Sequence, residues 1–245
     1  VLEDRDGSLW LGAESLGLVH LDGGRREILG RAEGLPNSRV ASLLRDQEGN
    51  LWIGSRAGLS RWKSTPVSPF GIAEGLGGQF ISTLSGDGEG NLWIGSWRSG
   101  LYRFRNGRME RQQLPLPDLD VLIRVTASSP AGVLWVSTWQ ELLERTGEGW
   151  RRYPHQAHSI AFDTRGGMWM GSNAGLHHFP QGRPDASAPV VKAANVSALW
   201  IDRKSTVWAG GLDGLWRVDG LAAKRVEGLP HASVTSLGED SAGRV

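Results

Sequence analysis

The sequence contains no cysteine, which excludes disulfides and thiolate metal sites but leaves the redox compartment open. Its charge is almost balanced, with 27 Lys and Arg against 26 Asp and Glu. No run of Lys and Arg is long enough to follow a phosphate backbone, so no nucleic acid partner is expected. The apolar runs are no longer than a strand, and neither a signal peptide nor a membrane contact of this segment is predicted.

Glycine and tryptophan are the abundant residues, with 35 Gly and 12 Trp in 245 residues. Glycine at this level without a collagen period indicates many tight turns. The tryptophans belong to a repeat, because the heptapeptide GNLWIGS occurs at residues 49–55 and again at residues 90–96. Related tryptophans are spaced by 42, 41, 42, 34 and 39 residues, at Trp10, Trp52, Trp93, Trp135, Trp169 and Trp208.

The residues around each tryptophan also recur. An Asp lies six positions before it in every copy except the fourth, which has Ser129, and a Gly lies three positions before it in every copy except the sixth, which has Ser205. A Gly-Leu pair follows each tryptophan, except that the fourth copy has Glu141-Leu142. Alternating segments such as VASLLRD at residues 40–46 predict strands, and Asp-x-x-Gly predicts a tight hairpin between two of them.

Four short strands in about 40 residues are typical of a β-propeller blade. We therefore predict an all-β protein with six four-stranded blades, in which each repeated tryptophan fills the wedge between neighbouring blades. Residues 237–245 align with residues 1–9, and the next position would be a seventh tryptophan. We expect residues 1–245 to be one partial propeller, six blades and the start of a seventh, from a longer seven-bladed propeller.

The pattern D-x-x-G-N-L-W-I-G-S-x-x-G-L-x-R, with GLP at residues 34–36 and 228–230, resembles the two-component regulator propeller repeat. The resemblance implies the periplasmic sensor part of a hybrid histidine kinase or a membrane-bound diguanylate cyclase. It also implies a neighbouring propeller or β-sandwich domain, a dimeric parent and a small-molecule ligand, frequently a carbohydrate breakdown product. No cofactor is expected.

Two loops between the second and third strands carry a tryptophan that the scaffold does not require. These loops hold Trp97 with Arg98 and Trp139 with Gln140, and we expect them side by side on one rim. An indole beside Arg and Gln suits a sugar ring and its hydroxyls. The alternative is that the rings pack on each other or on a neighbouring domain.

Further candidates lie on the same rim. Arg56 occupies the corresponding loop of the second copy, and polar or aromatic residues precede several inner strands, where they would surround the mouth of the channel: Arg39, Gln79, Phe80 and Asp120, with Asn37, Asp118, His155, His158 and His231. Most of the second group could equally be solvated loop side chains. The spacing of His155 and His158 could suit a metal, but no third ligand is near them in the sequence, and no metal site is predicted.

The sequence has no G-x-S-x-G, no P-loop and no dinucleotide fingerprint, so this segment is not expected to be an enzyme. Two other functions stay open. A propeller similar to streptogramin lyase would favour W-F-T where these copies have W-I-G-S. A protein-interaction scaffold would spread its rim aromatics evenly over all blades.

Overall fold

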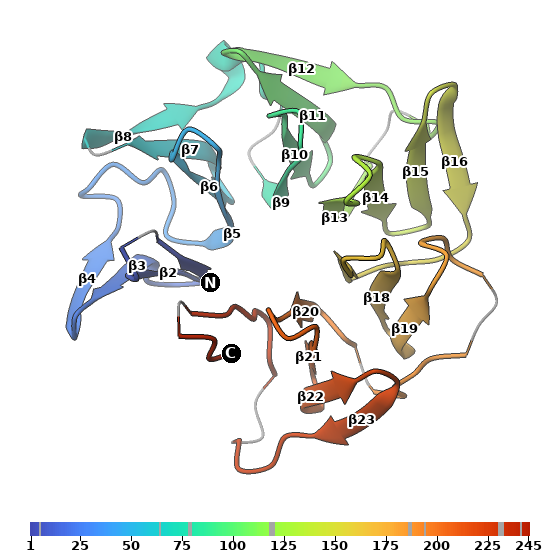
Figure 1. Ribbon diagram of the computed structural model, residues 1–245. Helices are drawn as coiled ribbons and strands as arrows, with labels where there is room; N and C mark the ends of the chain where they lie inside the picture. Colours follow the sequence, from blue (N-terminus) through green and yellow to red (C-terminus); the bar gives the residue numbers. More distant parts are fainter. Residues whose placement is uncertain are drawn as a thin grey trace.

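The computed structural model describes residues 1–4, 6–63, 65–77, 80–117, 121–185, 188–193, 195–229, 233–240 and 242–245, without the side chains of residues 63, 65–68 and 73. Six antiparallel sheets stand around a central axis (Figure 1). The helical structure of the described residues is one short 3₁₀ turn, Ile72–Glu74. The predicted propeller of six blades is confirmed.

Blades are numbered in chain order, and the strands of each blade run outward from the axis in sequence order. Blade 1 contains β1 (Leu2–Glu3), β2 (Leu9–Ala13), β3 (Gly17–Asp22) and β4 (Arg25–Leu29). Blade 2 contains β5 (Val40–Arg45), β6 (Leu51–Ser55), β7 (Gly58–Lys63) and β8 (Thr65–Phe70). Blade 3 contains β9 (Ile81–Gly86), β10 (Leu92–Ser96), β11 (Gly100–Arg105) and β12 (Arg108–Gln112).

The second half of the chain repeats this order. Blade 4 contains β13 (Ile123–Ser128), β14 (Leu134–Thr138), β15 (Leu142–Thr146) and β16 (Gly149–Tyr153). Blade 5 contains β17 (Ser159–Phe162), β18 (Met168–Ser172) and β19 (Gly175–Phe179). Blade 6 contains β20 (Ala198–Ile201), β21 (Val207–Gly211), β22 (Gly214–Asp219) and β23 (Ala222–Arg225).

Blade 5 differs from the prediction, because its sheet has three strands in the described part of the chain. At the outer edge Val191 makes an isolated bridge to Leu176 in place of a fourth strand. The segment after β19 contains prolines at 180, 184 and 189, which offer no backbone N–H, but proline alone does not exclude an outer strand, since β8 pairs with β7 although it contains Pro69.

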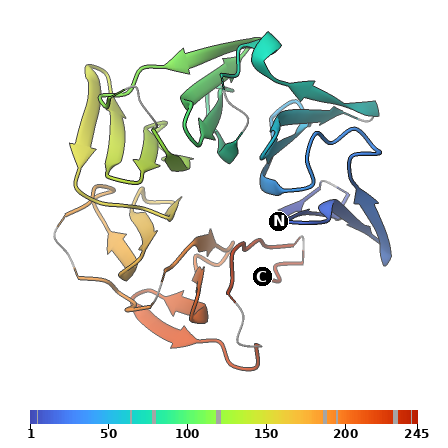
Figure 2. The same ribbon diagram turned by 180° about the vertical axis from the view of Figure 1, so that it is seen from behind.

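The two ends of the chain meet beside the axis, and both ribbon views place the termini near each other (Figures 1 and 2). After blade 6, the Val234 amide donates to the Gly211 carbonyl at 3.0 Å. The amino group of Val1 donates to Ser236 Oγ at 2.9 Å. Residues 233–240 therefore lie where a further inner strand would begin, between blade 6 and blade 1.

The predicted Asp-x-x-Gly hairpins are confirmed, and the aspartate does more than close the turn. In blade 2 the Gly49 amide donates to the Asp46 carbonyl at 3.1 Å, and Gly49 has a φ of 84°, which glycine adopts at little cost. Asp46 Oδ1 accepts from the Asn50 amide at 2.8 Å, while Oδ2 accepts from Trp52 Nε1 at 2.7 Å. The same carboxylate thus ties the turn to the repeated tryptophan.

Five of the six repeated tryptophans lie buried between blades, as predicted, whereas Trp208 of the last blade is only half-buried and belongs to none of the core clusters among the described residues. Trp52 is 1% exposed and packs in one cluster with Leu59 of its own blade and with Leu92, Ile94 and Tyr102 of blade 3. A large ring buried in this way contributes roughly 4–6 kcal/mol of gross hydrophobic stabilisation. Contact with the neighbouring blade is therefore a major source of stability for each blade.

The glycine that follows the tryptophan by two positions allows close approach of the next blade. A Cβ on Gly95 would lie 2.5 Å from Ile123 Cγ2, and one on Gly54 would lie 2.7 Å from Ile81 Cγ2. The fourth copy has Ser137 at this position, and its Oγ accepts from the Ala157 amide at 2.9 Å. Tight contact between blades therefore requires a small residue here.

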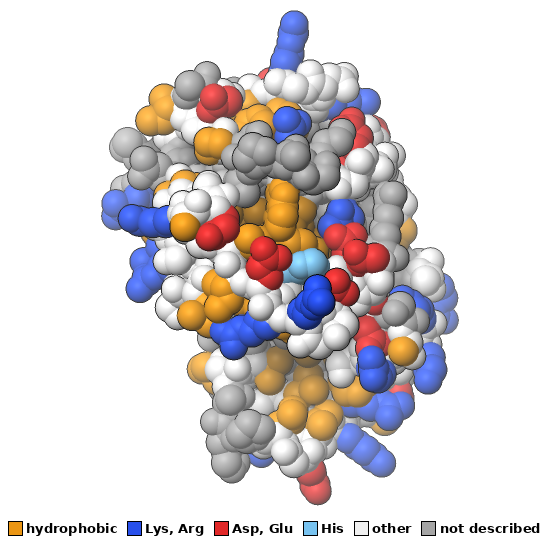
Figure 3. All heavy atoms as spheres, turned by 90° about the vertical axis from the view of Figure 1, so that its left-hand side faces the viewer, with side chains coloured by type: hydrophobic (Ala, Val, Ile, Leu, Met, Phe, Trp, Pro, Cys, Tyr) orange, Lys and Arg blue, Asp and Glu red, His pale blue; other side chains and the backbone are white. Residues whose placement is uncertain are grey.

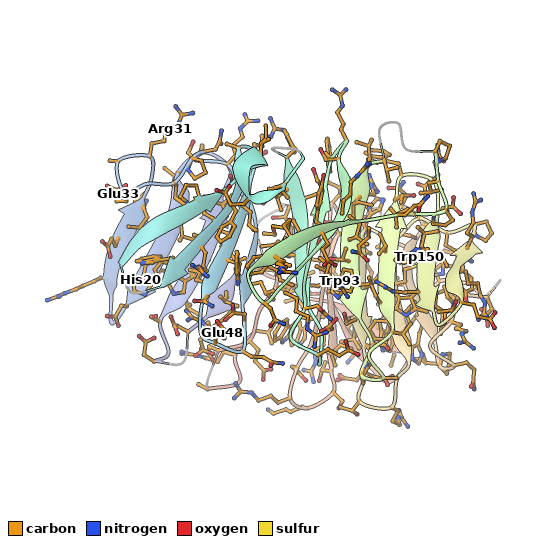
Figure 4. All side chains as sticks on the ribbon, turned by 90° about the horizontal axis from the view of Figure 1, so that it is seen from above. His20, Arg31, Glu33, Glu48, Trp93 and Trp150 are labelled. Carbon is orange, nitrogen blue, oxygen red and sulfur yellow. The ribbon has the colours of Figure 1, made fainter. Side chains whose placement is uncertain are left out.

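The strands alternate in direction, so the two sets of connections lie on opposite rims. We call the side with the hairpins between first and second strands the hairpin rim, and the opposite side the loop rim. Figure 4 shows Glu48 of a hairpin toward one edge of the disc and Arg31 and Glu33 of a connection between blades at the other. On one side of the outer wall, side chains of both charges are intermixed, and hydrophobic side chains show in its hollows (Figure 3).

Candidate functional site

In blades 2 and 4 a hydroxyl side chain at the end of the second strand holds the loop that follows. Ser55 Oγ donates to the Gly58 carbonyl at 3.0 Å and accepts from the Ala57 amide at 3.2 Å. Thr138 in blade 4 makes the corresponding bonds to the backbone of Glu141. In blade 3 the Trp97 amide donates to the Phe80 carbonyl at 2.8 Å. These backbone contacts hold the short loops 56–57, 97–99 and 139–141 on the loop rim.

Three aromatic rings follow one another on this rim, and we call them the aromatic row. Phe80 and Trp97 are stacked, with ring centroids 5.3 Å apart and an interplanar angle of 19°. Trp97 and Trp139 meet edge to face at 6.5 Å. An arginine lies at each end of the row: the guanidinium carbon of Arg56 is 4.5 Å from the Phe80 centroid, and that of Arg124 is 3.8 Å from the Trp139 centroid.

The aromatic row borders a cavity of about 460 Å³ at the mouth of the central channel. Its volume is that of a small-molecule site. We call it the rim cavity. Its lining comes from all six blades and the connections entering them: Glu14, Arg39, Val40, Ala41, Arg56, Phe80, Ile81, Ser82, Trp97, Arg124, His158, Asn195 and Ser197.

Positive charge dominates the rim cavity. Three guanidinium groups line it, those of Arg39, Arg56 and Arg124, against one carboxylate, that of Glu14. In the described part of the chain, none of the three arginines has a carboxylate within ion-pair distance. Arg124 is half-buried, and burial lowers the pKa of its guanidinium, although an arginine stays charged at neutral pH.

His158 lines the same cavity. Its Nδ1 contacts Oδ1 of Asn195, and because an amide oxygen can only accept, Nδ1 carries the proton. Its Nε2 is buried and has no hydrogen-bond partner among the described residues. Burial lowers the pKa of His158; the Asn195 bond opposes this in part, and the charge of Arg124 lowers the pKa further. The imidazole is therefore neutral at pH 7, with a lone pair on Nε2.

The structure brings together several of the predicted residues. Arg39, Arg56, Phe80 and Trp97 line the rim cavity, and Trp139 joins them through its contact with Trp97. The two tryptophans contact each other and still keep 39% and 43% of their surface exposed, so part of each indole remains accessible to a ligand.

Other predicted residues do not line the cavity. Arg98 and Gln140 are exposed on the same loops but are not part of its lining. His155 lies beside Phe179 of β19, with ring centroids 6.2 Å apart. Asn37 accepts a hydrogen bond from the Arg39 amide at 2.8 Å and so shapes the loop rather than the cavity wall. The remaining candidates lie outside the described residues: Gln79, Asp118, Asp120 and His231.

Sequence reasoning missed Arg124 and gave no weight to Asn195 or Glu14. A signal for Arg124 exists in the repeat. Around the start of each inner strand from blade 2 to blade 6, a buried apolar residue is followed by one that lines the rim cavity: Ala41, Ser82, Arg124, His158 and Ser197. Arg124 and His158 are the large polar residues at a position that is otherwise small.

Two other cavities are less suited to a small ligand. One of about 660 Å³ lies between blade 6 and blade 1 and is lined largely by the two chain ends, such as Val1 and Val245. One of about 330 Å³ lies on the hairpin rim, where Asp46 and Asp87 are already bonded within their turns. In the described residues no group of three or more His, Asp or Glu side chains could hold a metal ion.

The sequence model of the two component regulator propeller family matches residues 34–57 and 75–98. The resemblance to this family is confirmed. The two matched segments run from the connection before blade 2 to Ala57, and from Gly75 to Arg98, so both include a part of the rim cavity.

Solved structures share the fold. The extracellular domain of the hybrid two component system BT3049 from B. thetaiotaomicron has a TM-score of 0.82 at 18% identity, over 98% of this chain and 37% of that one. The extracellular domain of the one component system BT4673 from the same organism has a TM-score of 0.64 at 20% identity, over 98% and 37%. The chain thus spans 37% of the length of each of these chains.

A propeller enzyme is also similar. Virginiamycin B lyase from Staphylococcus aureus has a TM-score of 0.73 at 13% identity, over 97% of this chain and 88% of that one. At such identities the likeness establishes the fold alone. None of the curated proteins is significantly similar in sequence. Among the described residues, no helix is long and apolar enough to cross a membrane.

Proposed function

We propose that this propeller is the ligand-sensing part of a bacterial signal-transduction receptor and has no catalytic activity of its own. The observation that carries the proposal is the rim cavity of about 460 Å³, which is bordered by partly exposed aromatic rings and lined by three guanidinium groups. The match of blades 2 and 3 to the regulator propeller family and the likeness to an extracellular domain of a hybrid two component system support the same function.

The chemistry of the cavity suits a small hydroxylated ring. Indole faces stack on the apolar face of a sugar, and guanidinium, hydroxyl and imidazole groups bind its polar edge. The three arginines and Ser197 supply such groups, and Ser82 Oγ, which donates to the Ile123 carbonyl, can accept a further hydrogen bond. A saccharide, and in particular a short oligosaccharide, is therefore the ligand class that we propose.

The setting of the receptor forms part of the proposal. The propeller would be periplasmic and would contact an adjoining propeller or sandwich domain of a dimeric parent, which carries a histidine kinase or a diguanylate cyclase. Ligand binding changes the output only if the two signalling states differ in their affinity for the ligand. The cavity mouth, which draws on all blades, is a place where a shift between blades would change that affinity.

The first test measures binding of a saccharide panel to this protein by tryptophan fluorescence and by ligand-observed NMR. Saturable binding that is lost in Trp97→Ala and retained in Trp200→Ala is the expected result. Trp200 is a matched control, because it is 36% exposed and lines a different cavity. Binding that is equal in both variants would contradict the proposed site.

A lyase is the second candidate, because the chain shares its fold with virginiamycin B lyase and has a histidine, His158, among the residues that line the rim cavity. Incubation with virginiamycin B, followed by mass spectrometry, separates the two functions. We expect unchanged virginiamycin B. Its conversion, and loss of the conversion in His158→Ala, would replace the sensor with the enzyme.

A further inference from the structure

The charges of the rim cavity are unbalanced in a way that a neutral sugar would leave uncompensated. Arg39, Arg56 and Arg124 line it with a single carboxylate, that of Glu14. Within the described part of the chain, these guanidinium groups donate no hydrogen bond to a carboxylate and form no ion pair. Bringing a neutral ligand over them would remove water without supplying a counter-charge, which is unfavourable.

Arg124 is the arginine best placed to bind an anion. It is half-buried, and its guanidinium carbon lies over the face of the Trp139 ring at 3.8 Å. Stacking uses the flat face of the guanidinium and leaves the N–H groups at its edge, in a fork that matches the two oxygens of a carboxylate. Trp139 therefore holds Arg124 in one orientation while its donors stay available.

We propose that the ligand of the rim cavity is an acidic sugar, a hydroxylated ring with one carboxylate, and that Arg124 binds the carboxylate while the aromatic row contacts the ring. This inference rests on the proposed function and narrows it to one ligand class. The hydroxyl of Ser197 can bind a ring hydroxyl, and Ser82 Oγ, which donates to the Ile123 carbonyl at 2.7 Å, can still accept from one; an aromatic acid has no such hydroxyls. A cavity of about 460 Å³ admits a short saccharide and no extended polyanion.

The experiment compares two matched pairs of probes, glucuronate with glucose and galacturonate with galactose, which differ only in the carboxylate. Affinities are measured by saturation-transfer NMR and tryptophan fluorescence on the whole chain at low and high salt. We expect at least one acid to bind about tenfold or more tightly than its neutral partner, as a charge-assisted hydrogen bond implies. Salt should weaken binding of the acid and not of the neutral sugar.

The variants locate the effect. Arg124→Gln should remove the preference for the acid. If that variant does not fold, Arg39→Gln, an exposed change, is measured in its place and should reduce the preference. Arg165→Gln is the matched control, an exposed arginine in a hairpin on the opposite rim, and it should keep the preference. A preference that survives in a folded Arg124→Gln variant overturns the role of Arg124.

The remaining outcomes overturn the inference in distinguishable ways. If the acidic and the neutral sugars bind equally well, the proposal of an acidic ligand is wrong, whereas the proposed function as a saccharide sensor still holds. If benzoate binds and neither glucuronate nor galacturonate binds, the ligand is an acid but not a sugar, and the inference is overturned. Absence of binding by all four sugars overturns both the inference and the saccharide ligand of the proposed function.

Discussion

The guanidinium carbon of Arg124 lies 3.8 Å from the centroid of the Trp139 ring. Arg124 belongs to the inner strand of blade 4, whereas Trp139 lies in the loop after the second strand of the same blade. The contact therefore joins the mouth of the channel to the loop rim. It makes the exposed tryptophans and the channel arginine parts of one surface.

The first prediction concerns Trp97 and Trp139. Replacing either by alanine should weaken binding of the small ligand at least about fivefold, because an exposed ring that contacts a ligand is a typical binding hot spot. The free energy of unfolding should change by about 1–2 kcal/mol, less than for a core tryptophan, since both rings are partly exposed. Titration and thermal unfolding of each variant measure the two effects, and unchanged affinity in both would contradict the site.

The second prediction concerns contact between blades. Gly95→Ala should lower the free energy of unfolding by about 1–3 kcal/mol, because its Cβ would lie 2.5 Å from Ile123 Cγ2 and from Thr83 Cγ2 and the blades must move apart. Gly88→Ala is the control, with no heavy atom within 4 Å of its Cβ and an expected change within about 0.5 kcal/mol. Urea unfolding compares them, and equal stability would mean that the blades adjust freely.

Much of this architecture could be predicted from the sequence, because the repeat recurs at every blade. The strand order, the hairpins and the rim loops follow from local patterns of alternation, Asp-x-x-Gly and Gly-Leu. The bond between Asp46 and Trp52 was not predicted, because the periodicity shows that both recur and not that they touch. The three-stranded sheet of blade 5 was not predicted, because the average repeat conceals how the segment after β19 departs from it.

The candidate site was predictable only where it lies on loops. Trp97 and Trp139 stand out because the scaffold does not require them. They lie beside each other because they occupy the same loop in two neighbouring blades. Arg124 belongs to a strand, and its side chain lines the channel mouth because the preceding Ile123 is buried against Gly95. Because that contact links two blades, it cannot be read from the sequence of a single repeat and is visible only in the three-dimensional structure.

The third prediction concerns acid. Burial alone would raise the pKa of Asp46, but hydrogen bonds from Asn50 and Trp52 lower it below the ordinary value of 3.8. A carboxyl group whose pKa is lowered in the folded state stabilises the fold above its ordinary pKa, and this contribution is lost as the pH falls through the folded value. The stability advantage of the wild type over Asp46→Asn should therefore shrink between about pH 5 and pH 2.

Urea unfolding of both proteins across that range measures the effect. Asp22→Asn, an exposed change at the end of β3, is the control and should run parallel to the wild type. A constant difference between wild type and Asp46→Asn at every pH would show that ionisation of Asp46 does not stabilise the hairpin.

The fourth prediction concerns a buried carboxylate away from the rim cavity. The side chain of Glu144 is 3% exposed; its Oε1 accepts from Arg183 Nε and Nη2 at 3.0 and 2.9 Å, and its Oε2 accepts from Tyr153 at 2.6 Å. Glu144→Gln keeps the shape but removes the charge, which should cost about 2 kcal/mol. Glu110→Gln is the matched control, because Glu110 also binds an arginine, Arg103, at 2.6 Å but is 52% exposed, and should cost well under about 1 kcal/mol. If urea unfolding finds equal losses, burial does not strengthen the Glu144 pairing, and the segment that carries Arg183 is held to blade 4 by other contacts.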